Sequence, residues 1–218
     1  MRKSLVVSAC MMGLLMGALP AFAGDGLFGT IEFRAKSLKA LPKWTRVLKT
    51  LQKEEKAYAK CAKDVRECGG GAMLSWRGKI RSLQGEGGLA TIQAVNSFAN
   101  QWPYIEDYKN YGVSDYWATP TEFLPNSGDC EDYAIFKYVT LKRLGFNPED
   151  MRLAVVKDTV RNIAHAVLVV KYADTFYVMD SLFDVVLPDT QVMQYLPYYS
   201  VNETTRWAHI MPREMGRK

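Results

Sequence analysis

The chain has 218 residues, of which 48% are hydrophobic, enough for one domain with a substantial core or one domain plus a helical extension. The formal net charge is +5 and falls to +3 if Arg2 and Lys3 are removed by processing, as the next paragraph predicts. This mild excess gives no reason to expect a nucleic-acid-binding protein, so no nucleic-acid partner is predicted.

The N-terminus has the pattern of a Sec-type export signal. It begins with Arg2 and Lys3, continues in an apolar run over residues 5–19 and closes with Ala21-Phe22-Ala23 before Gly24. An uncleaved membrane anchor is the alternative, but the run is shorter than the ~20 residues that span a bilayer. We therefore predict a cleaved signal peptide over residues 1–23 and an exported protein.

Three cysteines remain after cleavage. Cys61 and Cys68 are near in sequence and precede a glycine run, so they form a disulfide if the helix breaks between them. In an unbroken helix, seven residues rise about 10 Å, which is too far for an S–S bond. That pairing leaves Cys130 as the free thiol; the alternative is three buried, reduced cysteines.

Helical patterns dominate the first half of the chain. Residues 42–60 form an amphipathic pattern whose basic face is either simply solvated or meets a membrane surface or an acidic partner. Two more helical patterns cover residues 73–83 and 89–102. An aromatic stretch, residues 102–123, follows as a loop that forms either a cleft wall or a packed connection.

The second half changes its periodicity. A helix over residues 130–144 ends at Gly145, and short β-branched and aromatic runs come next, at residues 153–156, 164–170, 176–179, 185–187 and 207–211. Helices followed by strands predict an α+β fold, with an antiparallel sheet packed on the helix that carries Cys130. We expect one domain over residues 24–218, with a helical portion (24–102) and a catalytic core (103–218).

Cys130 occupies the first turn of the helix predicted after the turn at residues 125–128. The positive end of the helix dipole favours the nucleophilic thiolate there. Asp129, Glu131 and Asp132 surround the thiol, and their negative charge opposes its ionisation. A bound cation would resolve this conflict.

A cysteine nucleophile needs a base and a group that orients the base. His165 begins one apolar run and Asp180 ends the next. A two-residue turn at 172–173 would place Asp180 directly opposite His165, and a turn at 173–174 would make it the diagonal neighbour on the same face. His209 is a competing base without a carboxylate at comparable spacing, and a core histidine is the non-catalytic alternative for His165.

The acids around Cys130 have two interpretations. They complement the helix dipole, as acids at helix starts commonly do. Alternatively, Asp129 and Glu131 supply the first ligands of a Ca²⁺ site that Asp132, or Asp115 upstream, completes with backbone carbonyls. The spacing does not match an EF-hand loop.

Four segments of the chain form a recognisable set. They are Tyr116-Trp117-Ala118-Thr119-Pro120-Thr121-Glu122-Phe123, Gly128-Asp129-Cys130-Glu131-Asp132-Tyr133-Ala134, His165-Ala166-Val167 and Met179-Asp180-Ser181. Together they resemble the bacterial transglutaminase-like cysteine proteinases and, more narrowly, the LapG-type periplasmic proteases. The similarity spans most of the mature chain, is most specific from Trp117 to Ala134, and shows no departure at the catalytic positions. The N-terminal helical region carries no matching motif.

The resemblance implies a papain-like/transglutaminase-like core with Cys130 as nucleophile, His165 as general base and acid, and Asp180 as orienting carboxylate. It implies calcium dependence through Asp129 and Glu131. It also implies a periplasmic enzyme that cleaves the N-terminal region of a large surface adhesin and so disperses the biofilm.

The family also implies regulation by an inner-membrane cyclic-di-GMP receptor, whose periplasmic domain holds the protease. Trp117 is our candidate for an exposed aromatic anchor in that complex, with a buried cleft-wall role as the alternative. We expect the Cys130 amide to contribute to the oxyanion hole, with a second donor that the sequence does not identify. Rival functions are a transglutaminase-like acyltransferase, a peptidoglycan amidase or endopeptidase, and a non-catalytic binding module.

Overall fold

The computed structural model describes residues 26–212. The predicted signal peptide, residues 1–23, lies outside the described residues. Within the described part, no helix is both long enough and apolar enough to cross a membrane.

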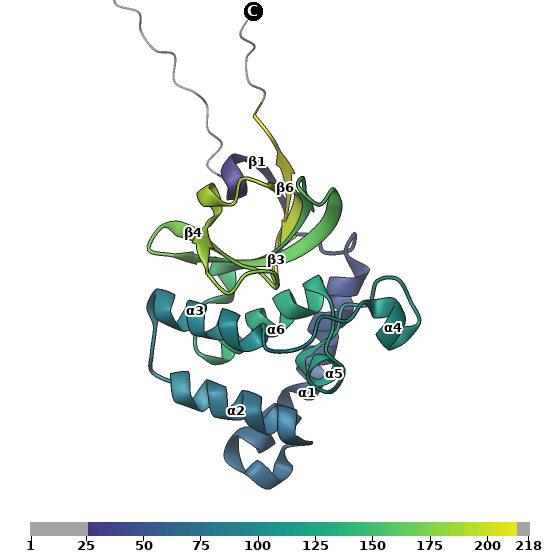
Figure 1. Ribbon diagram of the computed structural model, residues 1–218, viewed down its shortest axis with the longest axis vertical. Coiled ribbons are helices and arrows are strands. Elements are labelled where there is room, and N and C mark those ends of the chain that lie inside the picture. Colours follow the sequence, from purple (N-terminus) through teal and green to yellow (C-terminus); the bar gives the residue numbers. More distant parts are fainter. Residues whose placement is uncertain (1–25, 213–218) are drawn as a thin grey trace, which may run out of the picture.

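Helices fill the first half of the described chain and form the lower layer in Figure 1. The four predicted helical patterns are confirmed, with ends that shift by up to three residues. The longest, α1, buries Trp44, Val47 and Tyr58, as its apolar spacing predicts. The helices are α1 (Pro42–Lys63), α2 (Gly71–Leu83), α3 (Gly88–Ala99), α4 (Asp107–Tyr111), α5 (Pro120–Asn126) and α6 (Cys130–Arg143).

The aromatic stretch at residues 102–123 is more ordered than the predicted loop, since it contains α4 and the start of α5. The start of α5 has a recognisable cause. Pro120 occupies the first helical turn, and the Thr119 amide donates to Glu122 Oε2 at 2.7 Å in a capping box. Because α5 runs on to Asn126, the turn before Cys130 is shorter than predicted.

Six strands of the second half and β1, from the N-terminal end of the described chain, form one antiparallel sheet in the strand order β1-β7-β6-β2-β3-β4-β5. The α+β prediction is therefore confirmed. Strands β1 and β6 had not been predicted, and β5 starts at Leu187, so it shares only one residue with the run predicted at 185–187. The strands are β1 (Ile31–Ala35), β2 (Met151–Asp158), β3 (Ile163–Tyr172), β4 (Thr175–Met179), β5 (Leu187–Pro188), β6 (Tyr195–Val201) and β7 (Arg206–Ile210).

The sheet curls so that its two edges approach each other (Figure 1). The Phe28 amide, just before edge strand β1, donates to Asp189 Oδ2, just after edge strand β5, at 2.7 Å. The curl gives the sheet an inner apolar cluster that includes Val156, Val167 and Val169, while a second cluster joins the sheet to the helices. Both faces of β3 are thus buried, which explains its unbroken apolar run.

Helix α6 lies at the centre of the molecule, directly against the sheet (Figure 1). Every residue from Glu131 to Leu141 is buried, so this helix has little amphipathic character. Its apolar residues belong to the larger core cluster, and Trp44 of α1 closes that core by donating its Nε1 hydrogen to the Asn202 carbonyl at 2.7 Å. Cys130, at the start of α6, is thereby held on a rigid element next to β3.

Candidate active site

Cys130 is the first residue of α6, as predicted. Asp132 fixes this helix start, because its carboxylate accepts the backbone hydrogens of Ala118 at 2.5 Å and Asp129 at 3.2 Å. Gly128 is needed for the same contact, since a Cβ there would lie 2.1 Å from Asp132 Oδ2. Asp132 thus ties the preceding segment to the helix that presents the thiol.

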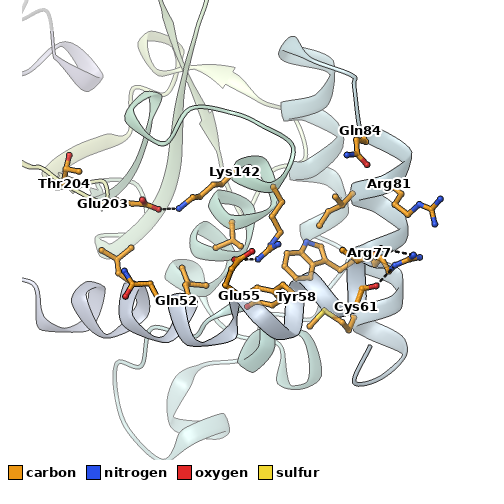
Figure 2. A pocket seen from close by; sticks show the side chains of 18 residues that line it. Gln52, Glu55, Tyr58, Cys61, Arg77, Arg81, Gln84, Lys142, Glu203 and Thr204 are labelled. Carbon is orange, nitrogen blue, oxygen red and sulfur yellow. Dashed lines mark hydrogen bonds and ion pairs between the residues drawn. The ribbon is translucent and has the colours of Figure 1, made fainter. Parts of the chain in front are cut away.

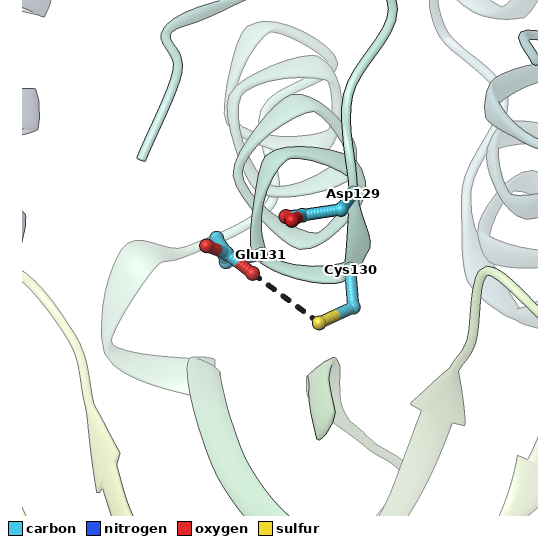
Figure 3. Close-up of side chains that lie close together, drawn as sticks. All are labelled: Asp129, Cys130 and Glu131. Atoms are coloured by element: carbon cyan, nitrogen blue, oxygen red, sulfur yellow. Dashed lines mark hydrogen bonds between the residues drawn. The ribbon is translucent and has the colours of Figure 1, made fainter. Parts of the chain in front are cut away.

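The thiol itself is in a strongly negative setting (Figure 3). Its Sγ donates to Glu131 Oε2 at 3.2 Å, with Asp129 beside it. Burial, followed by the charges of Glu131 and Asp129, raises the pKa of Cys130 well above its ordinary value. In the protein alone, burial and the acids therefore outweigh the helix dipole, and the thiol stays protonated.

The acids form a cluster larger than the sequence indicated. Carboxylate oxygens of Asp107, Asp115 and Glu131 lie within 4.8 Å of one another, as do those of Asp107, Asp129 and Asp132. Asp107 was not predicted, although it begins a short helix inside the aromatic segment that precedes Cys130. Asp115 is the exposed member and forms an ion pair with Lys43.

The chemistry of this cluster fits a hard cation. The Oδ1 atoms of Asp107 and Asp129 are buried, and neither has a hydrogen-bond partner among residues 26–212. Burial raises the pKa of Asp107 to about 6 and also raises that of Asp129. Burial, with the neighbouring carboxylates, raises the pKa of Asp132 to about 8 and of Glu131 to about 10. These carboxyl groups are buried close together, so they cannot all be ionised unless a positive charge lies beside them.

His165 and Asp180 meet on the sheet. His165 lies in β3, Asp180 directly follows β4, and both side chains are almost fully buried. His165 Nε2 lies 2.9 Å from Asp180 Oδ1, with the ring nitrogen as donor to the carboxylate. This pairing leaves Nδ1 as the ring nitrogen available to accept a proton.

The hairpin register decides this pairing. Tyr172 pairs with Thr175 in the β3–β4 ladder, so the turn is Ala173-Asp174, and both residues have positive φ. Of the two registers left open by the sequence, the second is therefore the one observed. Asp180 is the same-face diagonal neighbour of His165 rather than its direct partner.

Asp180 has a complete set of hydrogen-bond donors. Tyr195 Oη donates to Oδ2 at 2.5 Å, and the Leu182 amide donates to Oδ1 at 2.9 Å. Although burial opposes it, hydrogen bonding to His165 and Tyr195 lowers the pKa of Asp180 overall. Tyr195 could not be predicted for this role, because β6 had not been predicted and is separated from β4 in the sheet by β2 and β3.

Side chains of α3 hold the segment after Asp180. Asn100 Nδ2 donates to the Asp180 carbonyl at 3.0 Å, and Asn96 Nδ2 donates to the Phe183 carbonyl at 2.8 Å. Lys137 of α6 is fully buried nearby, and its Nζ has no hydrogen-bond partner among the described residues. Burial lowers the pKa of Lys137 to about 7, although the negative charges of Asp180 and Asp184 act to raise it.

The thiol lies against the strand that carries the histidine. The Ala166 backbone hydrogen, one residue after His165, acts on Cys130 and counters part of the rise in the thiol pKa. The phenol of Tyr104 is also close enough for Cys130 to affect its pKa, which burial chiefly raises. Tyr104 stacks on Tyr133 with ring centroids 6.2 Å apart, next to the start of α6.

His209, the competing base, has a structural role. Thr30 Oγ1 lies 2.8 Å from its Nδ1, and Ser200 Oγ lies 2.9 Å from its Nε2, so both ring nitrogens are occupied. Its side chain is fully buried, which lowers its pKa. Glu32 Oε1 lies 3.8 Å from His209 Nδ1, so the preference for His165 rests on the occupied ring nitrogens of His209 and on the shorter, 2.9 Å contact between His165 and Asp180.

Trp117 is not the exposed aromatic anchor that we expected. Its exposed fraction is only 6%, and its ring packs edge-on against Trp44, with centroids 6.4 Å apart. The Trp117 carbonyl accepts a hydrogen bond from Arg46. The residue therefore packs in the core beside the acid cluster, which agrees with the buried alternative.

The cysteine pairing is confirmed. Cys61 and Cys68 form a disulfide, and Cys130 is the free cysteine of the described chain. The helix breaks between the two cysteines, as the disulfide requires. Helix α1 ends at Lys63, and a separate turn, Val65–Glu67, precedes Cys68. The alternative of three reduced cysteines is excluded.

A helix-start cysteine, on a helix that packs against the strand carrying a hydrogen-bonded histidine–aspartate pair, is typical of papain-like or transglutaminase-like cysteine enzymes. Comparison of the sequence with protein families gives a match to the bacterial transglutaminase-like cysteine proteinases over residues 52–215. The chain belongs to this family and is a cysteine protease. No curated protein sequence matches it significantly.

Solved structures of LapG from Legionella pneumophila have the same fold. One is 31% identical, with a TM-score of 0.60, covering 71% of this chain and 86% of that one. A calcium-bound form is 30% identical, with a TM-score of 0.61 and coverages of 70% and 86%. An EGTA-treated form is 30% identical, with a TM-score of 0.61 and coverages of 74% and 87%.

Proposed function

We propose that this protein is a calcium-dependent cysteine endopeptidase whose triad is Cys130, His165 and Asp180. The observation that carries the proposal is the buried His165–Asp180 hydrogen bond on the strand against which the Cys130 helix packs. Membership of the proteinase family supports the activity, and the calcium-bound LapG structure supports the metal.

The proposed reaction uses the free nitrogen of the imidazole. His165 Nδ1 takes the thiol proton of Cys130, and the thiolate sulfur attacks the carbonyl carbon of the scissile peptide bond. The imidazolium then gives its proton to the leaving amine nitrogen as the C–N bond breaks, and a thioester remains. Water, deprotonated by His165, attacks the thioester and releases the carboxylic acid and the free thiol.

Asp180 orients the imidazole throughout and stabilises its charged form. The Cys130 backbone hydrogen, at the start of α6, is free to bind the carbonyl oxygen as negative charge develops on it. The Tyr104 phenol, beside the same helix start, is our candidate for the second donor.

Calcium would be held by Asp129 and Glu131, with Asp107 and Asp115 completing the carboxylate set. When bound, the ion supplies the positive charge that the cluster lacks, so that these carboxyl groups ionise. It also offsets the repulsion that keeps the Cys130 thiol protonated.

The substrate that we propose is the N-terminal region of a large surface adhesin, cleaved in the periplasm after export directed by residues 1–23. Cleavage would release the adhesin and promote biofilm dispersal. An inner-membrane cyclic-di-GMP receptor is the proposed inhibitory partner. These assignments rest on the resemblance to the LapG-type proteases.

One assay tests the activity and its metal dependence together. The purified protein is incubated with an adhesin N-terminal fragment in calcium, in magnesium and in a chelator, with Cys130→Ala as the matched control. We expect cleavage only by the unaltered protein in calcium. Cleavage by Cys130→Ala, or equal rates in calcium and chelator, would contradict the proposal.

Two further readouts separate the rival reactions. Incorporation of a labelled primary amine into protein would indicate an acyltransferase, and degradation of purified sacculi would indicate a peptidoglycan amidase. Failure of iodoacetamide to modify Cys130 in the presence of calcium would instead favour a non-catalytic binding module.

A further inference from the structure

A groove opens between α1 and α2 (Figure 2). Its volume is about 860 Å³, and its walls also include the end of α6 and residues Glu203 and Thr204. None of its lining residues belongs to the site around Cys130, so the proposed reaction does not account for it.

The groove has an apolar floor that lies below the surface. Tyr58 and Trp76 form the deepest part, with exposed fractions of 4% and 2%, and their rings pack edge-on with centroids 5.4 Å apart. Leu48, Leu51 and Ile80 line the walls and are half-buried. A volume of this size is within the ~300–1,000 Å³ typical of ligand pockets, and it accommodates several apolar side chains.

The rim is basic and only partly neutralised. Arg143 pairs with Glu55 at 2.8 Å, and Lys142 pairs with Glu203 at 2.5 Å. Arg77 instead donates to backbone carbonyls at the end of α1, including that of Cys61 at 2.7 Å. Arg81 is exposed and forms no ion pair within residues 26–212. Neither Arg77 nor Arg81 therefore forms an ion pair with a carboxylate in the described part of the chain.

The elements that form the groove are basic as a group. Residues 42–83 contain eleven Lys and Arg against four Asp and Glu, whereas the whole chain has 28 against 23. The excess positive charge is thus concentrated on the two helices that border the groove. Such a field favours an acidic ligand and raises its rate of association.

We propose that this groove is a docking site for an acidic protein segment that carries apolar anchor residues. The apolar side chains of the segment enter the recess above Trp76, and its carboxylates face Arg77 and Arg81. A flat lipid surface is a poorer match, because the apolar floor is recessed, whereas a peptide side chain can reach it. The inference does not depend on the protease activity.

The probe is a synthetic, fluorescein-labelled helical peptide of about four turns, with leucine on one face and glutamate elsewhere. Its binding to the purified protein is measured by fluorescence anisotropy, against a matched peptide with lysine in place of glutamate. We expect saturable binding of the glutamate peptide and binding at least about tenfold weaker of the lysine peptide.

Three variants locate the binding. Arg81→Glu changes an exposed side chain and is expected to weaken binding about fivefold or more, because it reverses a rim charge. Ile80→Ala removes part of the apolar wall and is expected to weaken binding about threefold or more. Lys36→Glu reverses an exposed charge outside the groove and should leave the affinity within about twofold.

The proposal is overturned if the glutamate peptide does not bind, or if Arg81→Glu and Ile80→Ala bind it like the unaltered protein. Binding to anionic phosphatidylglycerol vesicles that requires Arg81, without binding of the peptide, would assign the face to a membrane instead. Cleavage of a short peptide substrate by Arg81→Glu is measured in parallel, so that a failure of the proposed protease activity is recognised separately.

Discussion

The two halves of the proposed active site differ in how complete they are within the protein itself. Around Asp180, each carboxylate oxygen accepts hydrogen bonds, and the pKa of the acid is lowered. Around Cys130, the Oδ1 atoms of Asp107 and Asp129 have no hydrogen-bond partner among the described residues, and the pKa is raised for Asp107, Asp129, Glu131 and Asp132. The sheet therefore preorganises the histidine–aspartate pair, whereas the helix start needs a cation to reach its ionised state.

The largest effect on catalysis should come from a change in the His165–Asp180 half of the site. Asp180→Asn removes the carboxylate that holds Nε2 of His165, and an amide does not favour the required tautomer. We expect kcat to fall by about 10³–10⁴-fold. Circular dichroism should show an unchanged fold, and a loss smaller than tenfold would mean that Asp180 is not the orienting group.

The incomplete half should respond to calcium and to Glu131→Gln. In the unaltered protein, removing calcium with a chelator should lower the cleavage rate by at least about 10²-fold, because the thiol pKa stays raised. Glu131→Gln should be similarly slow and insensitive to calcium. The measurement is the rate against free calcium concentration, and full activity of Glu131→Gln in calcium would exclude this residue as a ligand.

The same half predicts a pH dependence of stability without calcium. Burial raises the folded-state pKa to about 6 for Asp107 and to about 8 for Asp132, above the values for unfolded chains. The folded state then binds more protons, so the stabilisation is full below about pH 4 and is lost as the pH rises through 6 and 8.

Chemical denaturation in a chelator at several pH values measures this loss. Saturating calcium should reverse it, since an ion bound only by the folded state adds about 2.7 kcal/mol at 100 times its Kd. A stability in chelator that rises between pH 5 and pH 8 would contradict the assignment.

Tyr195→Phe is a smaller change in the His165–Asp180 half of the site. It removes one O–H donor to Asp180 but leaves the His165 hydrogen bond in place. We expect kcat to fall about tenfold and the free energy of unfolding to fall by about 1–2 kcal/mol. Tyr199→Phe is a control on the same strand, and an equal loss of kcat in that variant would mean that the effect is not specific to Asp180.

Lys137→Met should have the smallest effect on catalysis, because its expected effect is confined to stability. The lysine is buried without a hydrogen-bond partner among the described residues, so a methionine of similar length should stabilise the fold by about 1–3 kcal/mol near pH 7. Burial lowers the pKa of Lys137 in the folded state to about 7, so the unfolded chain binds more protons at this group above pH 7. The free energy of unfolding of the unaltered protein should therefore rise as the pH rises above 7. Denaturation of Lys137→Met should lack that gain, and destabilisation at every pH would contradict this account.

Local patterns predicted the elements that local forces determine. The apolar spacing of α1 and the glycine after α6 are visible in the sequence, and so are the short turn and the alternation that bring His165 and Asp180 to one face. Strand β1 was missed because it is short and lies at an edge, with exposed residues such as Phe33. Helix α5 was missed although its capping box, Thr119 with Glu122, is a readable pattern.

Contacts between distant segments supplied the rest. Asp107 joins the acid cluster from another helix, Tyr195 reaches Asp180 from β6, and Trp117 turns inward onto Trp44 of α1. None of these follows from spacing, because each depends on how whole elements pack. The same holds for the groove between α1 and α2, whose basic face was visible in the sequence while its recess was not.

The sequence by itself therefore indicated the fold class and the candidate thiol, imidazole and carboxylate, and it left the disulfide conditional on a helix break between Cys61 and Cys68. It did so because helix and strand periodicity, turn length and cysteine spacing act over a few residues. Only the tertiary structure decided the surroundings of those groups, since packing buries Cys130 beside neighbouring carboxylates, and both raise the pKa of the thiol. Electrostatic energies depend on distance and dielectric environment, and both are properties of the packed molecule.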